Sequence, residues 1–202
     1  MRKAFSSLLM LLVCITFLST IMKASEPVAS NPALVPAIAS NNTIVVSNST
    51  DVPDAHVVQL AVYKIAGSNY FRLRDLAMIL KGSEKQFSVS YEERTKTVSL
   101  ISGKEYTATG SELRGTASEN ANAAISNNEI YINGESVTLT VYKIEGSNYF
   151  KLRDLGEALD FYVGYDDRTK TVYISGAKGY EKDTGPAETR QPMISYEQQA
   201  VH

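Results

Sequence analysis

The sequence predicts an α+β protein of two tandem repeats, each a small antiparallel β-sheet curled around or covered by one α-helix. Three observations predict this class. The phrase "YKIAGSNYFRLRDL", which begins at Tyr63, recurs as "YKIEGSNYFKLRDL" from Tyr142. Apolar and polar residues alternate before and after both copies, which favours strands. A leucine stripe at helical spacing ends the phrase, which favours one helix in each repeat.

The two copies keep a fixed register that changes once. Val62 and Val141 begin a stretch in which the copies lie 79 residues apart, and from Phe87 and Phe161 onward the separation is 74. The first copy therefore has five extra residues in the segment 81–86, as a surface loop tolerates. The predicted parts are a signal peptide at 1–24, a flexible spacer at 25–42, a first repeat at 43–106, a linker at 107–128, a second repeat at 129–180 and a disordered tail at 181–202.

Each repeat is expected to begin with a β-hairpin. In the second copy Asn133-Gly134 separates the alternating runs "IYI" and "ESVTLTVYKI", and Asn-Gly is a strong hairpin signal. In the first copy the matching strands are "TIVV" and "VVQLAVYKI", joined by a longer loop. Gly67-Ser68 and Gly146-Ser147 then predict turns, with the asparagines that follow suited to a left-handed or capping position. A short "YF" strand comes next.

A helix and a second hairpin complete each repeat. One apolar stripe at i, i+3, i+4 and i+7 predicts the first helix, with Leu73, Leu76, Ala77 and Leu80. The second copy keeps leucine at three of these positions, Leu152, Leu155 and Leu159. The segments "FSVSYEERTKTVSLI" and "FYVGYDDRTKTVYI" each predict two strands around a polar turn.

The first residues predict export. Arg2 and Lys3 precede an apolar run over 4–22, and a small residue follows at Ala24. This pattern is typical of a signal peptide cleaved near Ala24, with an uncleaved membrane anchor as the alternative. Cys14 lies in the run, so the mature chain has no disulfide and depends on its core alone. We expect a secreted or cell-surface protein.

The charge balance excludes a nucleic-acid partner. Removal of the signal peptide takes away three of the 20 basic residues, which leaves 17 against 22 acidic residues and a net charge of −5. Binding to a phosphate backbone needs a basic face, which a mildly acidic chain of mixed charges does not predict.

No combination of residues predicts catalysis or metal binding. The histidines are His56, in a predicted loop, and the terminal His202, whereas a metal site wants two or three converging ligands. The acidic pairs Glu92-Glu93 and Asp166-Asp167 fall in predicted turns, where aspartate and glutamate are solvated turn formers. We therefore expect no metal, no cofactor and no enzyme activity.

Four residues kept in both copies are the candidates for ligand binding: Tyr70, Arg74, Tyr149 and Arg153. The arginines are suited to hold carboxylates or phosphates, and tyrosines on a sheet face are suited to sugars or peptides. Each also has a simpler interpretation, since an arginine stem packs across a sheet edge and half-buried tyrosine suits a strand. The sequence favours the packing interpretation and leaves the binding one open.

The stretches "GSNYFKLRDL" and "YDDRTKTVYI" resemble the copper amine oxidase N-terminal-like domain, also called a stalk domain. This family is common in exported proteins of Gram-positive bacteria. The resemblance covers both copies and implies an antiparallel sheet curled around one helix. In amine oxidases the copper and the quinone cofactor belong to a separate catalytic domain. The resemblance therefore implies neither a copper site nor oxidase activity.

These observations predict a secreted, non-catalytic module of the cell envelope that binds a wall polymer or an extracellular protein. Two copies raise avidity if both reach one ligand. Self-association is also open, and contact with a membrane is expected only if the signal segment is uncleaved. Two alternatives remain: a small extracellular hydrolase or redox enzyme with a site between the repeats, and a membrane-anchored structural spacer.

Overall fold

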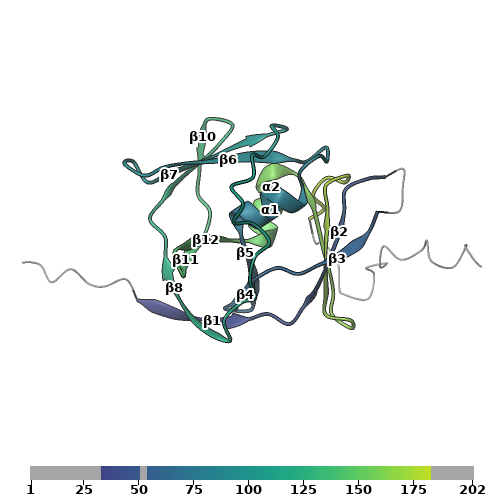
Figure 1. Ribbon diagram of the computed structural model, residues 1–202, viewed down its shortest axis with the longest axis horizontal. Helices are drawn as coiled ribbons and strands as arrows, with labels where there is room; N and C mark the ends of the chain where they lie inside the picture. The colour runs from purple at the N-terminus through teal and green to yellow at the C-terminus, as the bar shows by residue number, and fades with distance from the viewer. Residues whose placement is uncertain (1–32, 51–53, 183–202) are drawn as a thin grey trace, which may run out of the picture. The chain divides into compact units, whose positions relative to one another are not determined.

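The computed structural model describes residues 33–50 and 54–182, and in these residues the protein is mostly β (Figure 1). The predicted signal peptide and all but the first two residues of the predicted tail lie outside the described residues. The elements in chain order are β1 Leu34–Ala39, β2 Thr43–Ser47, β3 His56–Val58, β4 Val62–Ile65, β5 Ser68–Arg72, α1 Leu73–Ile79, β6 Phe87–Glu92, β7 Thr97–Ser102, β8 Asn120–Ile125, β9 Glu129–Ile132, β10 Glu135–Val137, β11 Val141–Ile144, β12 Ser147–Lys151, α2 Leu152–Leu159, β13 Tyr162–Asp166 and β14 Thr171–Ser175.

Six antiparallel strands close a barrel in the order β1-β4-β5-β12-β11-β8. Each repeat contributes three of them once it is extended to include the strand that precedes it, β1 for the first repeat and β8 for the second. The repeats meet at two places in this barrel. On one side β5 pairs with β12, with Phe71 opposite Phe150. On the other side β1 pairs with β8, with Ala37 opposite Ala121. Neither repeat could form the barrel alone.

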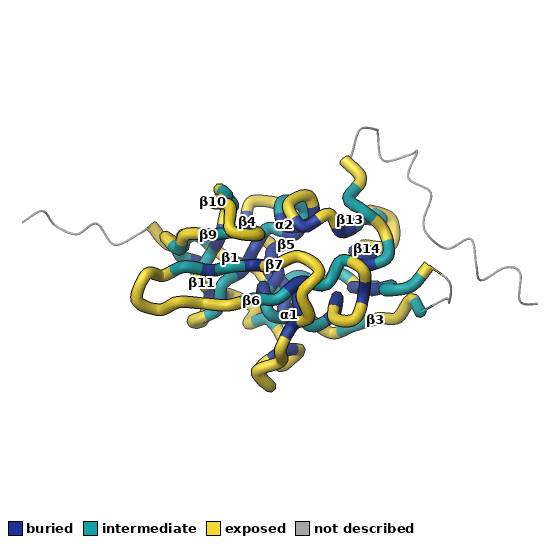
Figure 2. The backbone as a smooth tube through the Cα atoms, turned by 90° about the horizontal axis from the view of Figure 1, so that it is seen from above, coloured by how far each residue is buried: buried dark blue, intermediate teal, exposed yellow. Residues whose placement is uncertain are grey.

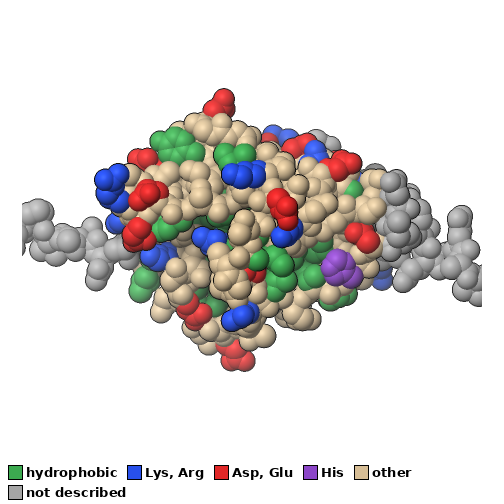
Figure 3. Space-filling model, turned by 45° about the horizontal axis from the view of Figure 1, so that its top comes forward, with side chains coloured by type: hydrophobic (Ala, Val, Ile, Leu, Met, Phe, Trp, Pro, Cys, Tyr) green, Lys and Arg blue, Asp and Glu red, His purple; other side chains and the backbone are tan. Residues whose placement is uncertain are grey.

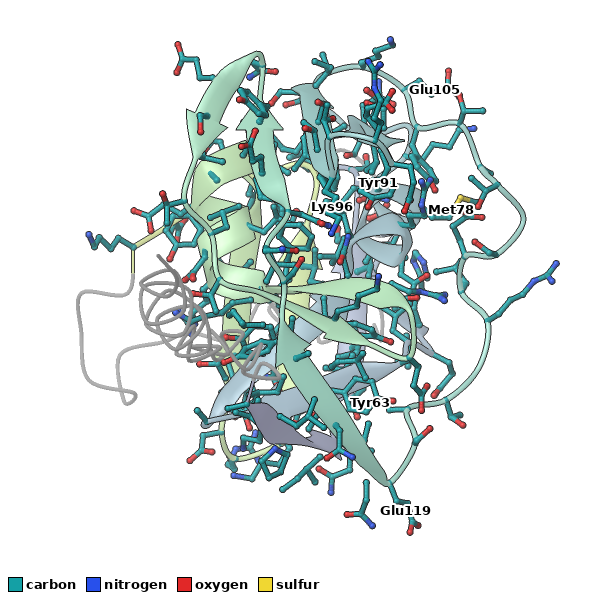
Figure 4. All side chains as sticks on the ribbon, turned by 90° about the vertical axis from the view of Figure 1, so that its left-hand side faces the viewer. Tyr63, Met78, Tyr91, Lys96, Glu105 and Glu119 are labelled. Atoms are coloured by element: carbon teal, nitrogen blue, oxygen red, sulfur yellow. The ribbon has the colours of Figure 1, made fainter. Side chains whose placement is uncertain are left out.

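Tyrosines and alanines fill the barrel together. Tyr63 packs edge to face on Tyr149, and Tyr70 on Tyr142, each pair with 5.2 Å between ring centroids and 74° between ring planes. Figure 4 shows Tyr63 among the barrel strands. Alanines dominate the inward positions of β1 and β8: Ala37, Ala121 and Ala123 are buried, with Val35 partly buried beside them, and these small side chains leave room for the rings. This explains why the sequence of β1 and β8 carries little of the β-branched and aromatic residue content typical of strands.

The main core lies outside the barrel, between one barrel wall and the helices. Val62, Phe71, Phe150 and Val141 are successive cross-strand neighbours on β4, β5, β12 and β11, and all are buried. The helices pack on this row through their leucine stripes, which are fully buried as the sequence predicts. Figure 2 shows buried stretches of chain at both helices and along the strands next to them.

Each repeat exchanges a hairpin with the other. The second repeat's β9–β10 hairpin joins β6–β7 of the first, through parallel pairing of β7 with β9. In the same way β2–β3 of the first repeat joins β13–β14 of the second, through parallel pairing of β14 with β2. The two four-stranded sheets flank the helices, one at the top and one at the right of Figure 1.

The predicted α+β class, with a separate sheet-and-helix unit for each repeat, is wrong. The helices have only seven and eight residues, and each four-stranded sheet contains strands from both repeats. Strands β1 and β8 lie in the segments 25–42 and 107–128, for which the sequence predicted a spacer and a linker. All described residues belong to one compact unit. Alternation along a strand reveals which face is buried, but not which strand lies beside it.

Most local elements agree with the sequence prediction, with one shift. The Asn133-Gly134 hairpin is present, and both residues have positive φ, 53° and 86°, as a two-residue turn requires. In the first repeat, the turn predicted at Gly67-Ser68 lies one residue earlier, at Ala66-Gly67, with φ of 47° and 81°. Asn69 therefore lies inside β5 and is extended, so the predicted left-handed or capping role is wrong.

Candidate functional site

A cleft of about 300 Å³ lies where the first repeat's α1 and β6 meet the β11–β12 turn of the second repeat. Both repeats contribute polar side chains to its lining: Arg74, Tyr91 and Glu93 from the first, and Asn128, Lys143 and Asn148 from the second. The hairpin exchange explains this arrangement, because it carries Asn128, next to β9, alongside β7. The cleft is therefore a product of the interlocked fold.

Arg72 also lines the cleft, but its positive charge is neutralised by an ion pair with Asp75. Its Nη2 and Nε donate to the two carboxylate oxygens of Asp75 at 2.7 Å and 3.0 Å, and Nη2 also donates to the Ser111 carbonyl at 3.0 Å. Asp75 is 1% exposed and accepts a further bond from the Leu113 N–H at 3.0 Å. A buried carboxylate needs such a paired cation, so we interpret Arg72 as structural.

A second polar network orients Arg74. Its Nη1 donates to the Tyr106 hydroxyl at 3.2 Å, and that hydroxyl donates to Glu112 at 2.6 Å. The Thr109 N–H and hydroxyl donate to the same carboxylate at 2.9 Å and 2.6 Å. Burial alone would raise the pKa of Glu112, but the hydrogen bonds from Thr109 and Tyr106 outweigh it and hold the pKa well below its usual range. Glu112 therefore stays ionised and fixes the loop that supports Arg74.

Tyr91 and Lys143 are cleft residues whose side chains are exposed to solvent and available to a ligand. Tyr91 is 40% exposed although it continues the alternation of β6, and Figure 4 shows it apart from the barrel tyrosine Tyr63. Lys143 is exposed on β11. On the face shown in Figure 3, basic and acidic side chains are interspersed, so attraction depends on local groups more than on a field of one sign. Arg74 and Lys143 outnumber the one acidic lining residue, Glu93, once Arg72 is neutralised.

The four residues singled out from the sequence lie in different places. Arg74 lines the cleft. Tyr70 and Tyr149 are each 5% exposed and lie inside the barrel, where they pack on other tyrosines. Burial, reinforced by the neighbouring Tyr63, raises the pKa of Tyr149 to about 12. Arg153 begins the corresponding helix of the second repeat and is half-buried. The structure thus brings none of the other three into the cleft of Arg74.

Among the cleft residues that sequence reasoning did not select, Lys143 and Asn148 are the most informative. Lys143 and Asn148 flank a hairpin turn of the second repeat, and nothing local connects them with a helix of the first. A signal was nevertheless present, because the repeated phrase keeps a lysine and an asparagine at these positions in both copies, Lys64 and Asn69 in the first. The asparagine was interpreted as part of the turn, and the lysine carried no signal beyond its recurrence.

Within residues 33–50 and 54–182, no cluster of three or more His, Cys, Asp or Glu side chains is placed to hold a metal ion. His56 is exposed at the start of β3, with Nδ1 2.7 Å from the Asp54 carbonyl oxygen. Among the same residues there is no helix with the length and apolar character needed to cross a membrane.

The resemblance of the repeated phrase to stalk domains stays an expectation. Comparison of the chain with models of protein families, with curated proteins and with solved structures finds no match.

Proposed function

We propose that the chain is a non-catalytic binding module of the cell envelope that holds an acidic polymer in the cleft between α1, β6 and the β11–β12 turn. One observation carries the proposal. Arg74 and Lys143, from different repeats, line a single cleft together with the exposed ring of Tyr91. The interlocked fold is what brings these groups to one place.

The cleft chemistry suits a polymer that carries carboxylate or phosphate groups on a hydroxyl-rich backbone. A guanidinium forms paired hydrogen bonds with either kind of acid, and a lysine ammonium adds a mobile positive charge. The amides of Asn128 and Asn148 can donate to and accept from hydroxyl groups. The ring of Tyr91 offers an apolar face with a polar edge. A volume of about 300 Å³ matches a short segment of such a polymer.

A polymer suits this surface better than a folded protein partner. Protein interfaces centre on apolar and aromatic anchors and exclude charge from their middle. Here the groups that line the cleft are mainly polar, and cations from both repeats are among them. The basic start and apolar run at the N-terminus, together with the stalk-domain resemblance, support an exported location in which wall polymers are at hand.

Co-sedimentation of the purified protein with isolated cell walls tests the proposal. We expect the protein to sediment with intact walls and to be released by high salt, because the contact is charge-assisted. We expect it to remain in solution with walls from which the acidic polymers have been extracted. Equal binding to intact and extracted walls, or no binding to intact walls, overturns the proposal.

Paired variants connect that binding with the cleft. The double variant Arg74→Gln with Lys143→Gln should weaken binding by about tenfold or more, since each charge-assisted hydrogen bond is worth about 1.5–3 kcal/mol. The matched control is Arg114→Gln with Lys104→Gln, which removes the same charge at exposed positions outside the cleft lining. Equal loss in both double variants would mean that binding follows net charge and does not use this cleft.

A further inference from the structure

Six polar residues that line the cleft have counterparts at matching positions of the other repeat. Arg74 corresponds to Arg153 and Lys143 to Lys64, each 79 residues away along the chain. The remaining matches are Tyr91 with Tyr165, Glu93 with Asp167, Asn128 with Asn42, and Asn148 with Asn69. Each pair keeps the residue type except for the one acid, where glutamate becomes aspartate.

We propose that Arg153, Lys64 and Tyr165 form a second binding cleft, which takes the same class of acidic polymer. This inference rests on the function proposed above for the cleft of Arg74. It adds a site in which the repeats exchange roles, since α2 and β13 come from the second repeat and the β4–β5 turn comes from the first.

The strand pairing supports this second cleft directly. Parallel pairing of β7 with β9 places Thr97 opposite Glu129, next to Asn128. Parallel pairing of β14 with β2 places Thr171 opposite Thr43, next to Asn42. Both pairs join corresponding residues of the repeats, so the register is the same. The barrel order is also unchanged when the strands of one repeat are exchanged for those of the other. The β4–β5 turn should therefore lie against α2 in the same way as the β11–β12 turn lies against α1.

Contacts within the second set agree with the register. The Asn42 side-chain amide donates to the Asn69 side-chain oxygen at 3.3 Å, so these two asparagines lie together, as their counterparts do in the first cleft. Lys170, whose Nζ is 2.6 Å from Asp167, lowers the pKa of that aspartate, and Lys64 lowers it further. The attraction of Lys64 thus reaches Asp167 from the other repeat, in agreement with the shared position of Lys143 and Glu93 in the first cleft.

The two clefts differ in the ion pair beside the start of the helix. In place of the buried Arg72–Asp75 pair, the second repeat has Lys151 and Asp154, which are 2.8 Å apart with about a third of each side chain exposed. A more solvated ion pair holds its surroundings less firmly. We therefore expect the second cleft to bind the same ligand more weakly than the first.

Titration calorimetry with a short polyanion tests the second cleft. The probe is tetragalacturonate in one arm and a glycerol phosphate tetramer in the other, which separates a carboxylate polymer from a phosphate polymer as the source. We expect two molecules of at least one probe per chain. We expect one per chain for Lys64→Gln with Arg153→Gln, and also one for Arg74→Gln with Lys143→Gln. The double variant Arg114→Gln with Lys104→Gln should still bind two.

The outcomes separate the two proposals. One probe molecule per wild-type chain, lost with the Arg74 and Lys143 substitutions and unaffected by the Lys64 and Arg153 substitutions, overturns the second cleft and supports the first. No binding of either probe to the wild-type chain overturns both. Circular dichroism of each variant shows that it is folded. Substitution of Tyr165 by alanine provides a second variant, which should also reduce the stoichiometry to one.

Discussion

At the residue scale, the aspartates at the two helix starts show how equivalent positions acquire different roles. Asp75 is buried and accepts from Arg72 and from the Leu113 N–H, so it joins β5, α1 and the loop after β7. Asp154 is half-exposed and forms an ion pair with Lys151 at 2.8 Å. Burial separates a structural ion pair from a surface one.

The substitutions Asp75→Asn and Asp154→Asn measure this difference. We expect Asp75→Asn to lower the free energy of unfolding by about 3 kcal/mol, because it leaves the Arg72 guanidinium without its carboxylate in a largely buried site. Asp154→Asn should cost less than about 1 kcal/mol. Urea unfolding followed by circular dichroism gives both values, and equal effects at the two positions would contradict the assignment.

The barrel tyrosines predict a loss of stability at alkaline pH. The pKa of Tyr149 is raised to about 12 by burial, so the folded protein holds this proton more tightly than the unfolded chain does. The stabilisation is fully present below the ordinary tyrosine pKa of about 10 and is lost as pH rises towards 12. Urea unfolding at about pH 8 and about pH 11 measures it.

The variant Tyr149→Phe isolates that contribution. Phenylalanine has no proton to lose, so its stability should fall less between the two pH values than that of the wild type, by about 1 kcal/mol per pH unit above 10. Tyr131→Phe is the control, since Tyr131 lies outside the barrel on β9. An equally steep alkaline loss in Tyr149→Phe would show that this side chain is not responsible.

At the element scale, the two helices differ at one position for a steric reason. Gly156 in α2 occupies the place of Ala77 in α1. A Cβ at Gly156 would lie 2.7 Å from Val163 Cγ2 and 3.1 Å from the Phe161 carbonyl oxygen. The first repeat has five additional residues between its helix and β6, and there a methyl group is accommodated and fully buried.

Gly156→Ala should therefore destabilise the protein even though alanine favours a helix. The gain in helix propensity is about 1 kcal/mol, whereas overpacking costs about 1–3 kcal/mol, so we expect a net loss. Ala77→Gly, the reciprocal change in α1, should also destabilise, through lost propensity and a lost buried methyl group. The unfolding midpoints of the two variants decide this, and a more stable Gly156→Ala would contradict the steric explanation.

Among the helices and strands, the sequence predicted those that depend on local signals. The leucine stripes and Asn133-Gly134 are local signals, and they predicted both helices and one hairpin correctly. Strands β1 and β8 were missed because alanine has a low strand propensity. Their alanines fit the space left by the tyrosine rings inside the barrel, and this packing requirement is visible only in the tertiary structure. The sequence could single out Arg74 as a candidate because both copies keep it, whereas Lys143 becomes a candidate only once the pairing between repeats is known.

At the scale of the whole molecule, strand pairing between repeats makes the halves mutually dependent. The pairs β1–β8, β5–β12, β7–β9 and β14–β2 all join one repeat to the other. Figure 4 shows the connecting loop running between the labelled Glu105 and Glu119, and its middle residues, 114–116, are exposed. The loop that connects the repeats is therefore accessible to a protease, whereas the strand pairs join the repeats independently of that loop.

Cleavage of this loop should leave the halves together. With a protease site inserted after Gly115, we expect the two fragments to co-elute in size-exclusion chromatography after cleavage and to separate in concentrated urea. Four strand pairs and a shared core hold them, and loop closure contributes only a modest entropy. Fragments that separate under native conditions would contradict the interlocked arrangement.

The central claim is that the groups brought together by this interlocking bind an acidic polymer. Amide chemical-shift mapping by NMR during a titration with tetragalacturonate or the glycerol phosphate tetramer tests it most directly. The account predicts that the largest changes occur at the cleft residues Tyr91, Ser147 and Asn148. Changes confined to the exposed barrel residues Leu34 and Ile38, or no change with either probe, would contradict it.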